Sequence, residues 1–214
     1  MKVYLERGRK RVFAGAIDWP GWSRSGRDDD AALEALLAAA GRYAQVAADA
    51  GLAFRPPRTA SALSVEEELP GDATTDFGAP SAWPAADSRP VSPKDLARLL
   101  AILDASWAAL DRAASAAGRR QLRPGPRGGG RQRAAILDHV SGVETGYLGR
   151  LAARAPKDPK AVRAAVVDAV ERAVTEGLPA AGPRGGVIWT PRFFVRREAW
   201  HVLDHAWEIQ DRSA

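Results

Sequence analysis

The sequence predicts a mainly α-helical protein, in which a four-helix bundle over residues 92–214 follows a small α+β region over residues 1–91. Two observations carry this prediction. From residue 92 onward, four stretches place apolar residues at helical spacing, and loops separate them. Before residue 92, two short runs alternate apolar and polar residues, and one stretch is clearly helical. We therefore expect two parts that meet near residue 91.

The N-terminal region begins with a predicted β-hairpin. Residues 2–7 alternate in the way that a half-buried strand does, and residues 11–19 predict a second strand. Residues 8–10, with the sequence GRK, can turn the chain between them. Residues 20–26 are expected to form a loop.

The next predicted elements are a helix, two short strands and a surface connection. Residues 27–51 predict one helix, which Asp28 begins and Gly51 ends. Residues 52–57 and 62–69 predict short strands. The following segment, up to residue 92, is rich in Pro, Asp, Ser and Gly. We expect it to be ordered on the surface, because its Phe77 and Trp83 are costly to leave fully in water.

Four helices follow, and three of them carry a recognisable N-terminus. Ser92, Asp158 and Thr190 each stand as an N-cap directly before a proline at the first helical position. The predicted helices span residues 92–118, 131–154, 158–178 and 190–212. Between the first two lies a basic, Gly/Pro-rich stretch over residues 118–133. A flexible solvated loop is favoured there over a phosphate-binding arm.

Composition excludes several kinds of chemistry. The chain has no cysteine, which rules out disulfides, thiolate-held zinc, iron–sulfur clusters and a cysteine nucleophile. The net charge of +5 admits nucleic-acid binding, but many basic residues stand beside acidic ones. No apolar run approaches the length of roughly 20 residues that spans a bilayer. We expect a cytoplasmic protein without a membrane partner, for which nucleic acid is a disfavoured partner.

Two of the three histidines, His201 and His205, lie four residues apart in the last predicted helix. Residues at this spacing share one face of a helix, so both imidazoles can point at a common centre. His139 lies in the second predicted helix of the bundle, where it can face them. Three converging rings would leave coordination positions open, which is typical of a catalytic metal site.

The alternative is that each histidine is buried with a polar partner or lies at the surface. A neutral imidazole in an apolar interior is costly unless it forms hydrogen bonds or binds a metal. One shared ion would offset that cost for all three rings. The sequence therefore predicts a divalent metal site at His139, His201 and His205.

The stretches LDHVSGVETGYL, with His139, and WHVLDHAWEIQDR, with His201 and His205, resemble the DinB superfamily. Its members are four-helix bundles that hold a metal with one histidine near the start of the second helix and an HxxxH pair on the fourth. The resemblance covers residues 92–212 and implies that the three histidines bind zinc, nickel or a similar divalent ion. The residues before 92 depart from the simple family pattern.

The same resemblance implies an activity. Several members are similar to thiol transferases, in which the metal activates a low-molecular-weight thiol such as mycothiol or bacillithiol. A mycothiol-dependent maleylpyruvate isomerase belongs to the same broad group. The expected function is thus a metal-dependent thiol transferase or isomerase that acts on a small electrophile, and the lack of cysteine fits an external thiol.

A second resemblance concerns the N-terminal region. Residues 12–47 are similar to the strand–loop–helix element of HicB-like domains. A shared small α+β element is favoured over a toxin–antitoxin role. It would cover one side of the bundle, since Trp19 and Trp22 give it apolar surface to bury.

Other candidate site residues lie around the histidines. Glu208, three residues after His205, is the preferred general base over Glu144, although a surface pair with Arg212 is an equal alternative. Arg196 and Arg197 are candidates to bind an anionic substrate or thiol cofactor, or form a solvated pair.

Three functional hypotheses remain open from the sequence. The first is the metal-dependent enzyme with a small-molecule substrate. The second is a metal-binding bundle without catalysis that serves as a regulatory module. The third, prompted by the basic pI and the HicB resemblance, is a nucleic-acid-associated protein. A homodimer is compatible with each of them.

Overall fold

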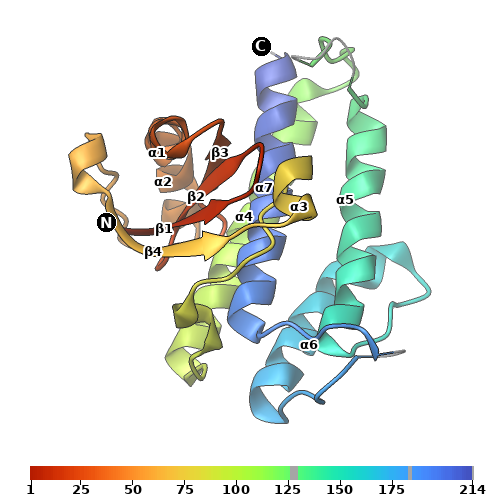
Figure 1. Ribbon diagram of the computed structural model, residues 1–214. Helices are drawn as coiled ribbons and strands as arrows, with labels where there is room; N and C mark the ends of the chain where they lie inside the picture. Colours follow the sequence, from red (N-terminus) through yellow and green to blue (C-terminus); the bar gives the residue numbers. More distant parts are fainter. Residues whose placement is uncertain (126–129, 183–184, 214) are drawn as a thin grey trace.

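The computed structural model describes residues 1–125, 130–182 and 185–213, and it is mainly helical with one small N-terminal sheet (Figure 1). The strands are β1 (Lys2–Arg7), β2 (Val12–Ala16), β3 (Ser23–Gly26) and β4 (Ser64–Pro70). The α-helices are α1 (Asp29–Ala38), α2 (Ala40–Asp49), α3 (Ala73–Phe77), α4 (Pro93–Ala117), α5 (Arg133–Tyr147), α6 (Val162–Thr175) and α7 (Pro191–Ser213). Four short 3-10 helices are η1 (Ala60–Ala62), η2 (Ala85–Ser88), η3 (Leu148–Leu151) and η4 (Pro159–Ala161).

The sheet has the strand order β3-β2-β1-β4. The predicted hairpin is confirmed, because β1 and β2 pair in antiparallel register, with Leu5 opposite Ala14. The predicted loop over residues 20–26 is wrong in its second half, where β3 pairs with β2. This strand is short, polar and at the sheet edge, so its sequence lacks the alternation of apolar and polar residues that predicts a strand. Of the two predicted short strands, residues 52–57 form none and the second is β4, which runs parallel to β1.

The helix predicted over residues 27–51 is broken at Ala39 into α1 and α2. Asp28 caps its start by accepting a hydrogen bond from the Ala31 amide at 2.9 Å, as predicted. The two helices pack against the sheet through Trp22, which is fully buried and stacks on Tyr43 with ring centroids 5.7 Å apart. The expectation that this tryptophan would be buried is confirmed.

The connection before α4 is ordered, but one of its two aromatic residues is not covered. Trp83 packs on Phe193, with ring centroids 4.7 Å apart. Phe77 is 86% exposed, so the expectation that it would be buried is wrong. Polar contacts hold its helix α3 instead, because Thr75 donates a hydrogen bond to the buried carboxylate of Glu6. The position of α3 therefore does not depend on burial of the ring.

Three of the four helical stretches after residue 92 begin at the predicted caps. Ser92 accepts a hydrogen bond from the Asp95 amide, Asp158 from that of Lys160 and Thr190 from that of Phe193. The second and third predicted helices are shorter as α-helix than expected, since η3 follows α5 and η4 precedes α6. Residues 126–129 of the predicted basic loop lie outside the described residues.

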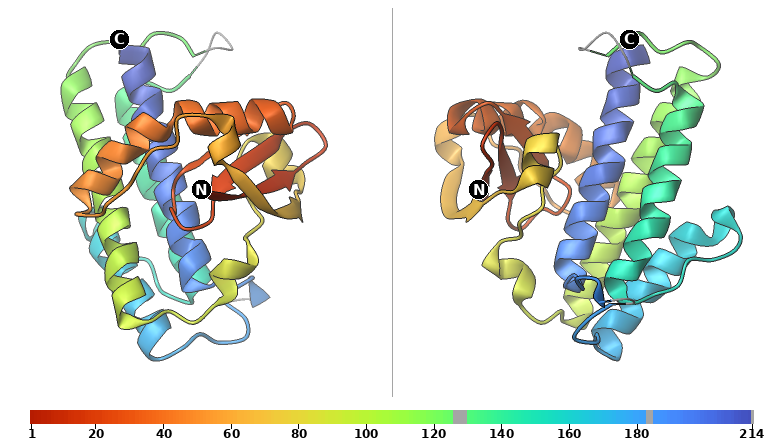
Figure 2. Two further views of the ribbon diagram at one scale, coloured as in Figure 1. Left: turned by 90° about the vertical axis from the view of Figure 1, so that its left-hand side faces the viewer. Right: turned by 45° about the vertical axis from the view of Figure 1, so that its right-hand side comes forward.

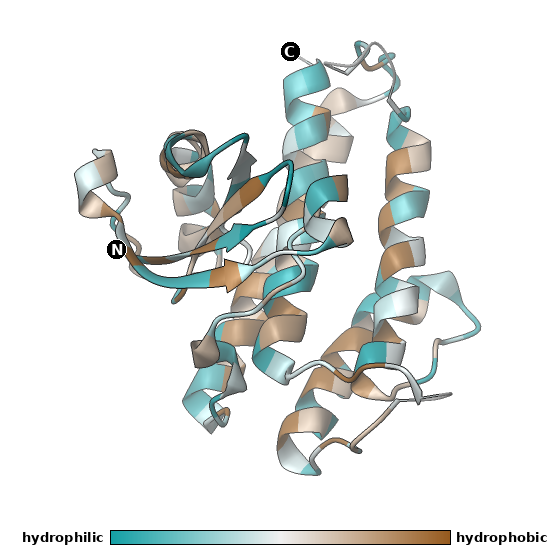
Figure 3. Ribbon diagram, in the orientation of Figure 1, coloured by the Kyte–Doolittle hydropathy of each residue, from teal (hydrophilic) through white to brown (hydrophobic). Residues whose placement is uncertain are grey.

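Helix α7 lies between the other elements. Figure 2 shows α4, α5 and α7 side by side as long rods, with α6 crossing near one end, and α7 contacts each of the other three. Every residue from Phe193 to Leu203 is buried. Helices α4, α5 and α6 carry both polar and apolar residues (Figure 3), as amphipathic helices do. Of the described helices, none has the length and apolar character needed to cross a membrane.

The parts on either side of residue 91 share one cluster of buried apolar residues. A buried ion pair also joins them. Arg196 of α7 donates to Asp87 of η2 from Nε at 2.6 Å and from Nη2 at 2.9 Å. Its Nη1 and Nη2 also donate to the carbonyl oxygens of Ala16 and Ile17, both at 2.6 Å. One side chain of α7 thus fixes the end of β2 and the segment before α4.

Substituting Asp87→Asn should therefore lower the free energy of unfolding by about 3–5 kcal/mol, because a buried guanidinium would lose its counter-charge. Urea denaturation measures the change. Asp18→Asn is the matched control, since the Asp18 side chain is exposed, and its midpoint should not move. Equal midpoints for the two variants would contradict a structural role for the pair.

Candidate metal centre

The fold brings the three histidines together. His139 comes from α5, and His201 and His205 come from neighbouring turns of α7. The Nε2 atoms of His139 and His201 lie 3.3 Å apart, and one nitrogen from each of the three rings lies within 4.8 Å of the others. The ring centroids are separated by 4.8–5.2 Å. Residues that are distant in sequence thus form one cluster of imidazoles.

This geometry fits a divalent ion. Two nitrogens bound at about 2.05 Å in tetrahedral geometry lie about 3.3 Å apart, which is the separation of the first two Nε2 atoms. The nitrogen of His205 lies within 4.8 Å of the other two and would have to move closer to share the ion. Without an ion, one of the two Nε2 atoms must donate a hydrogen bond to the other.

Two of the three rings are held in their neutral form. His201 is 6% exposed, and burial lowers its pKa to about 2, with further contributions from His205 and Arg197. Burial also lowers the pKa of His139. Neutral imidazole is the form that coordinates a metal, so protons compete weakly for these two rings at physiological pH.

Glu208 lies behind one of the histidines. Its Oε2 is 2.8 Å from Nδ1 of His205, and its Oε1 accepts a hydrogen bond from Arg212 at 2.5 Å. The hydrogen bond with His205 is the main reason that the pKa of Glu208 is lowered. A carboxylate at Nδ1 fixes the tautomer that leaves the Nε2 lone pair free. The arrangement favours a positioning role over the predicted general base, and the predicted pair with Arg212 is present.

A buried carboxyl pair lies in the same interior. Glu198 of α7 is 0% exposed, and neither of its oxygens has a hydrogen-bond partner among the described residues. Glu144 of α5 is also buried and accepts a hydrogen bond from Trp107 Nε1 at 2.6 Å. Burial raises the pKa of both, and Glu144 raises that of Glu198 further. Burial and the closeness of the two acids therefore favour the protonated form of the pair.

Sequence analysis singled out Glu144 but missed Glu198. The missed signal is spacing, because Glu198 precedes His201 by three residues and so shares its face of the helix. On α7, the buried acid thus lies one turn before a candidate ligand.

The two arginines proposed for anion binding have other positions. Arg196 is buried against Asp87, so an anion would have to displace that carboxylate. Arg197 is also buried, with its guanidinium 4.6 Å from the ring centre of Trp200 and 5.5 Å from that of Tyr147. Its Nη1 has no acceptor in the described part of the chain. Arg197 thus retains a donor toward the interior, whereas Arg196 does not.

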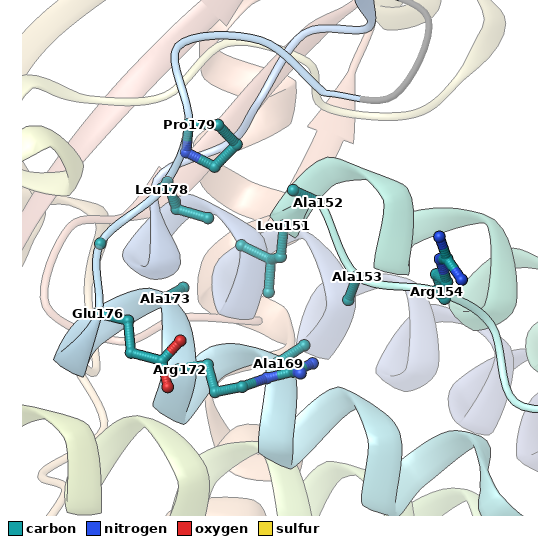
Figure 4. A pocket seen from close by; sticks show the side chains of 11 residues that line it. Leu151, Ala152, Ala153, Arg154, Ala169, Arg172, Ala173, Glu176, Leu178 and Pro179 are labelled. Carbon is teal, nitrogen blue, oxygen red and sulfur yellow. The ribbon is translucent and has the colours of Figure 1, made fainter.

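Asp138 and Asp204 directly precede two of the candidate ligands. Asp138 is exposed, and Asp204 pairs with Arg24 at 2.6 Å. A separate cavity of ≈ 450 Å³ lies between η3 and the end of α6 (Figure 4). None of the three histidines lines it.

Fold and site together define a mainly helical protein with a partly buried three-histidine cluster between α5 and α7. No protein family model, curated protein or solved structure matches the chain.

Replacement of the carboxylate behind His205 tests its positioning role. Glu208→Gln should weaken zinc or nickel binding about 10–100-fold, because the ring loses the charged acceptor that fixes its tautomer. Competition with a chromophoric chelator gives the affinity. Glu171→Gln, on the exposed face of α6, is the control and should bind like the unaltered protein. Affinities for the two variants within twofold of each other would rule out the positioning role.

The buried carboxyl pair predicts a pH-dependent stability. An acid with a raised pKa keeps its proton when folded and loses it when unfolded, so its contribution to stability falls as pH rises above the unfolded pKa of about 4.3. Glu198→Gln removes this loss. In metal-free protein, the stability gained by the variant should be small near pH 4 and grow by up to about 1.4 kcal/mol per pH unit above it.

Urea denaturation at a series of pH values measures this gain, with Glu171→Gln as the control for an exposed acid. A difference between Glu198→Gln and the unaltered protein that stays constant with pH, or that shrinks as pH rises, would show that the proton is not held by this pair.

Proposed function

We propose that this protein is a divalent-metal-dependent enzyme of DinB type, in which α4, α5, α6 and α7 form the four-helix bundle and His139, His201 and His205 hold the ion. The single observation that supports it best is the convergence of three imidazoles from two helices, with nitrogens at ligand-like separations. Zinc or nickel suits a set of three imidazoles with open positions.

The reaction that this site supports best is transfer or isomerisation by a thiol such as mycothiol, directed at a small electrophile. An ion at this position would lower the pKa of a thiol or water beside it and so supply a nucleophile near neutral pH. The thiol comes from outside, because the chain has no cysteine.

The residues of the chain have distinct parts in this proposal. Glu208 holds His205 in the tautomer with a free Nε2. The Glu144–Glu198 pair is buried and favours its protonated form, and Glu198 lies one turn before His201 on α7, so this proposal assigns the pair as the proton donor of the site. The aromatic side chains of Trp107, Tyr147 and Trp200 exclude bulk water around it. Together these residues bind the ion, hold a proton and keep the site dry.

The experiment that tests the metal site is metal analysis of protein purified without a histidine tag. About one equivalent of zinc or nickel per chain should bind, and His201→Ala should abolish binding. Circular dichroism provides the control that the variant still folds. Less than about a tenth of an equivalent of bound metal in the unaltered protein would contradict the proposed metal site.

A turnover assay then separates an enzyme from a non-catalytic metal-binding module. Mycothiol or bacillithiol should react with a chloronitrobenzene faster in the presence of the metal-loaded protein, and His139→Ala should remove the acceleration. Full metal loading without any acceleration would favour the module.

A further inference from the structure

A small polar cavity lies between the sheet and α7, next to the histidine cluster. Its volume is ≈ 220 Å³. The lining residues are Arg11, Phe13, Arg24 and Ser25 of the sheet region, Gly78 after α3, and Trp200 and Asp204 of α7. The N-terminal region and the long helix thus build it together.

Two of the lining residues carry buried hydrogen-bond donors without an acceptor among the described residues. Arg11 donates from Nη1 to Ser25 Oγ at 2.9 Å, but its buried Nε has no acceptor in the described residues. The indole Nε1 of Trp200, a side chain that is 6% exposed, likewise has none there. Buried donors of this kind are costly unless something accepts from them. An oxyanion would satisfy both.

The charge around the cavity is positive. Arg24 is neutralised by Asp204 at 2.6 Å, whereas Arg11 forms no ion pair within the part of the chain that the structure describes. Arg11, Arg24 and Asp204 together carry a net charge of +1. One negative charge on a ligand would balance it, and a guanidinium can bind the two oxygens of a carboxylate at once.

We infer that this cavity binds the carboxylate of a small organic acid, with Arg11, Ser25 and the indole N–H of Trp200 as its donors. The rings of Phe13 and Trp200 pack edge to face, with their centroids 5.8 Å apart. They offer an apolar wall to the carbon atoms next to the carboxylate. The cavity is smaller than a typical drug-sized site, which restricts the ligand to a compact molecule.

The position of the cavity connects it to the candidate metal centre. Trp200 and Asp204 directly precede His201 and His205, so the two sites occupy adjoining faces of α7 about 100° apart. A carboxylate held there would direct the rest of the molecule toward the histidines. Its role as a substrate site rests on the proposed function, whereas carboxylate binding itself requires no metal.

Binding to metal-free protein tests the inference independently of the metal site. Sodium acetate and sodium benzoate are titrated at constant ionic strength against sodium chloride, and the Trp200 Nε1–H resonance, assigned with Trp200→Phe, reports the location. A saturable shift is expected. Arg11→Gln should weaken binding at least about tenfold, since it removes a charge-assisted bond. Arg9→Gln, an exposed neighbour with the same charge change, should bind like the unaltered protein.

Trp200→Phe is a second variant, which keeps the aromatic wall and loses only the N–H donor. Calorimetry should show that it also binds acetate and benzoate more weakly than the unaltered protein. Equal affinities for Arg11→Gln and Arg9→Gln, or no saturable shift at all, would overturn the inference. Tighter binding of inorganic phosphate than of either carboxylate would overturn the choice of ligand. Failure of metal loading would leave this result unaffected.

Discussion

Helix α7 is enclosed by other elements over half its length, and yet its enclosed part carries Arg196, Arg197, Glu198 and His201. A buried polar group destabilises the folded protein unless it finds a partner. The surrounding structure can be understood as the supply of those partners. Asp87 from η2 neutralises Arg196, the rings of Tyr147 and Trp200 cover Arg197, and α5 brings Glu144 and His139 to face the remaining two.

Not all of these groups are satisfied by the chain. Glu198, Arg197 Nη1, the Nδ1 of His201 and the Nε1 of Trp200 have no hydrogen-bond partner among the described residues. A helix selected only for stability would carry apolar residues at such positions, because they pack at no electrostatic cost. Several unsatisfied polar groups along one helix are typical of functional sites, where groups that lower the stability of the fold are kept because they take part in binding or catalysis.

Sequence alone was sufficient where the determinants are local. The caps at Ser92, Asp158 and Thr190 depend on one side chain and the next turn, and they fixed the starts of three helices. The HxxxH spacing likewise fixes two histidines on one face. His139 was placed with them only by assuming that its helix faces α7, which the structure bears out as a spatial arrangement. The pairing of β3 with β2 and the solvent exposure of Phe77 depend on contacts with residues that are distant in sequence. The local pattern of apolar and polar residues therefore did not indicate either.

The most informative failure concerns Arg196. A pair of adjacent arginines was expected to act alike, but neighbours on a helix point about 100° apart and so meet different surroundings. Arg196 points to the N-terminal region and forms an ion pair with Asp87. Arg197 points toward Tyr147, and its Nη1 has no acceptor among the described residues. The same rotation separates Trp200 from His201. When a helix is buried on every face, successive residues contact different neighbouring elements. The N-terminal region therefore determines what the sheet-facing side of α7 can bind.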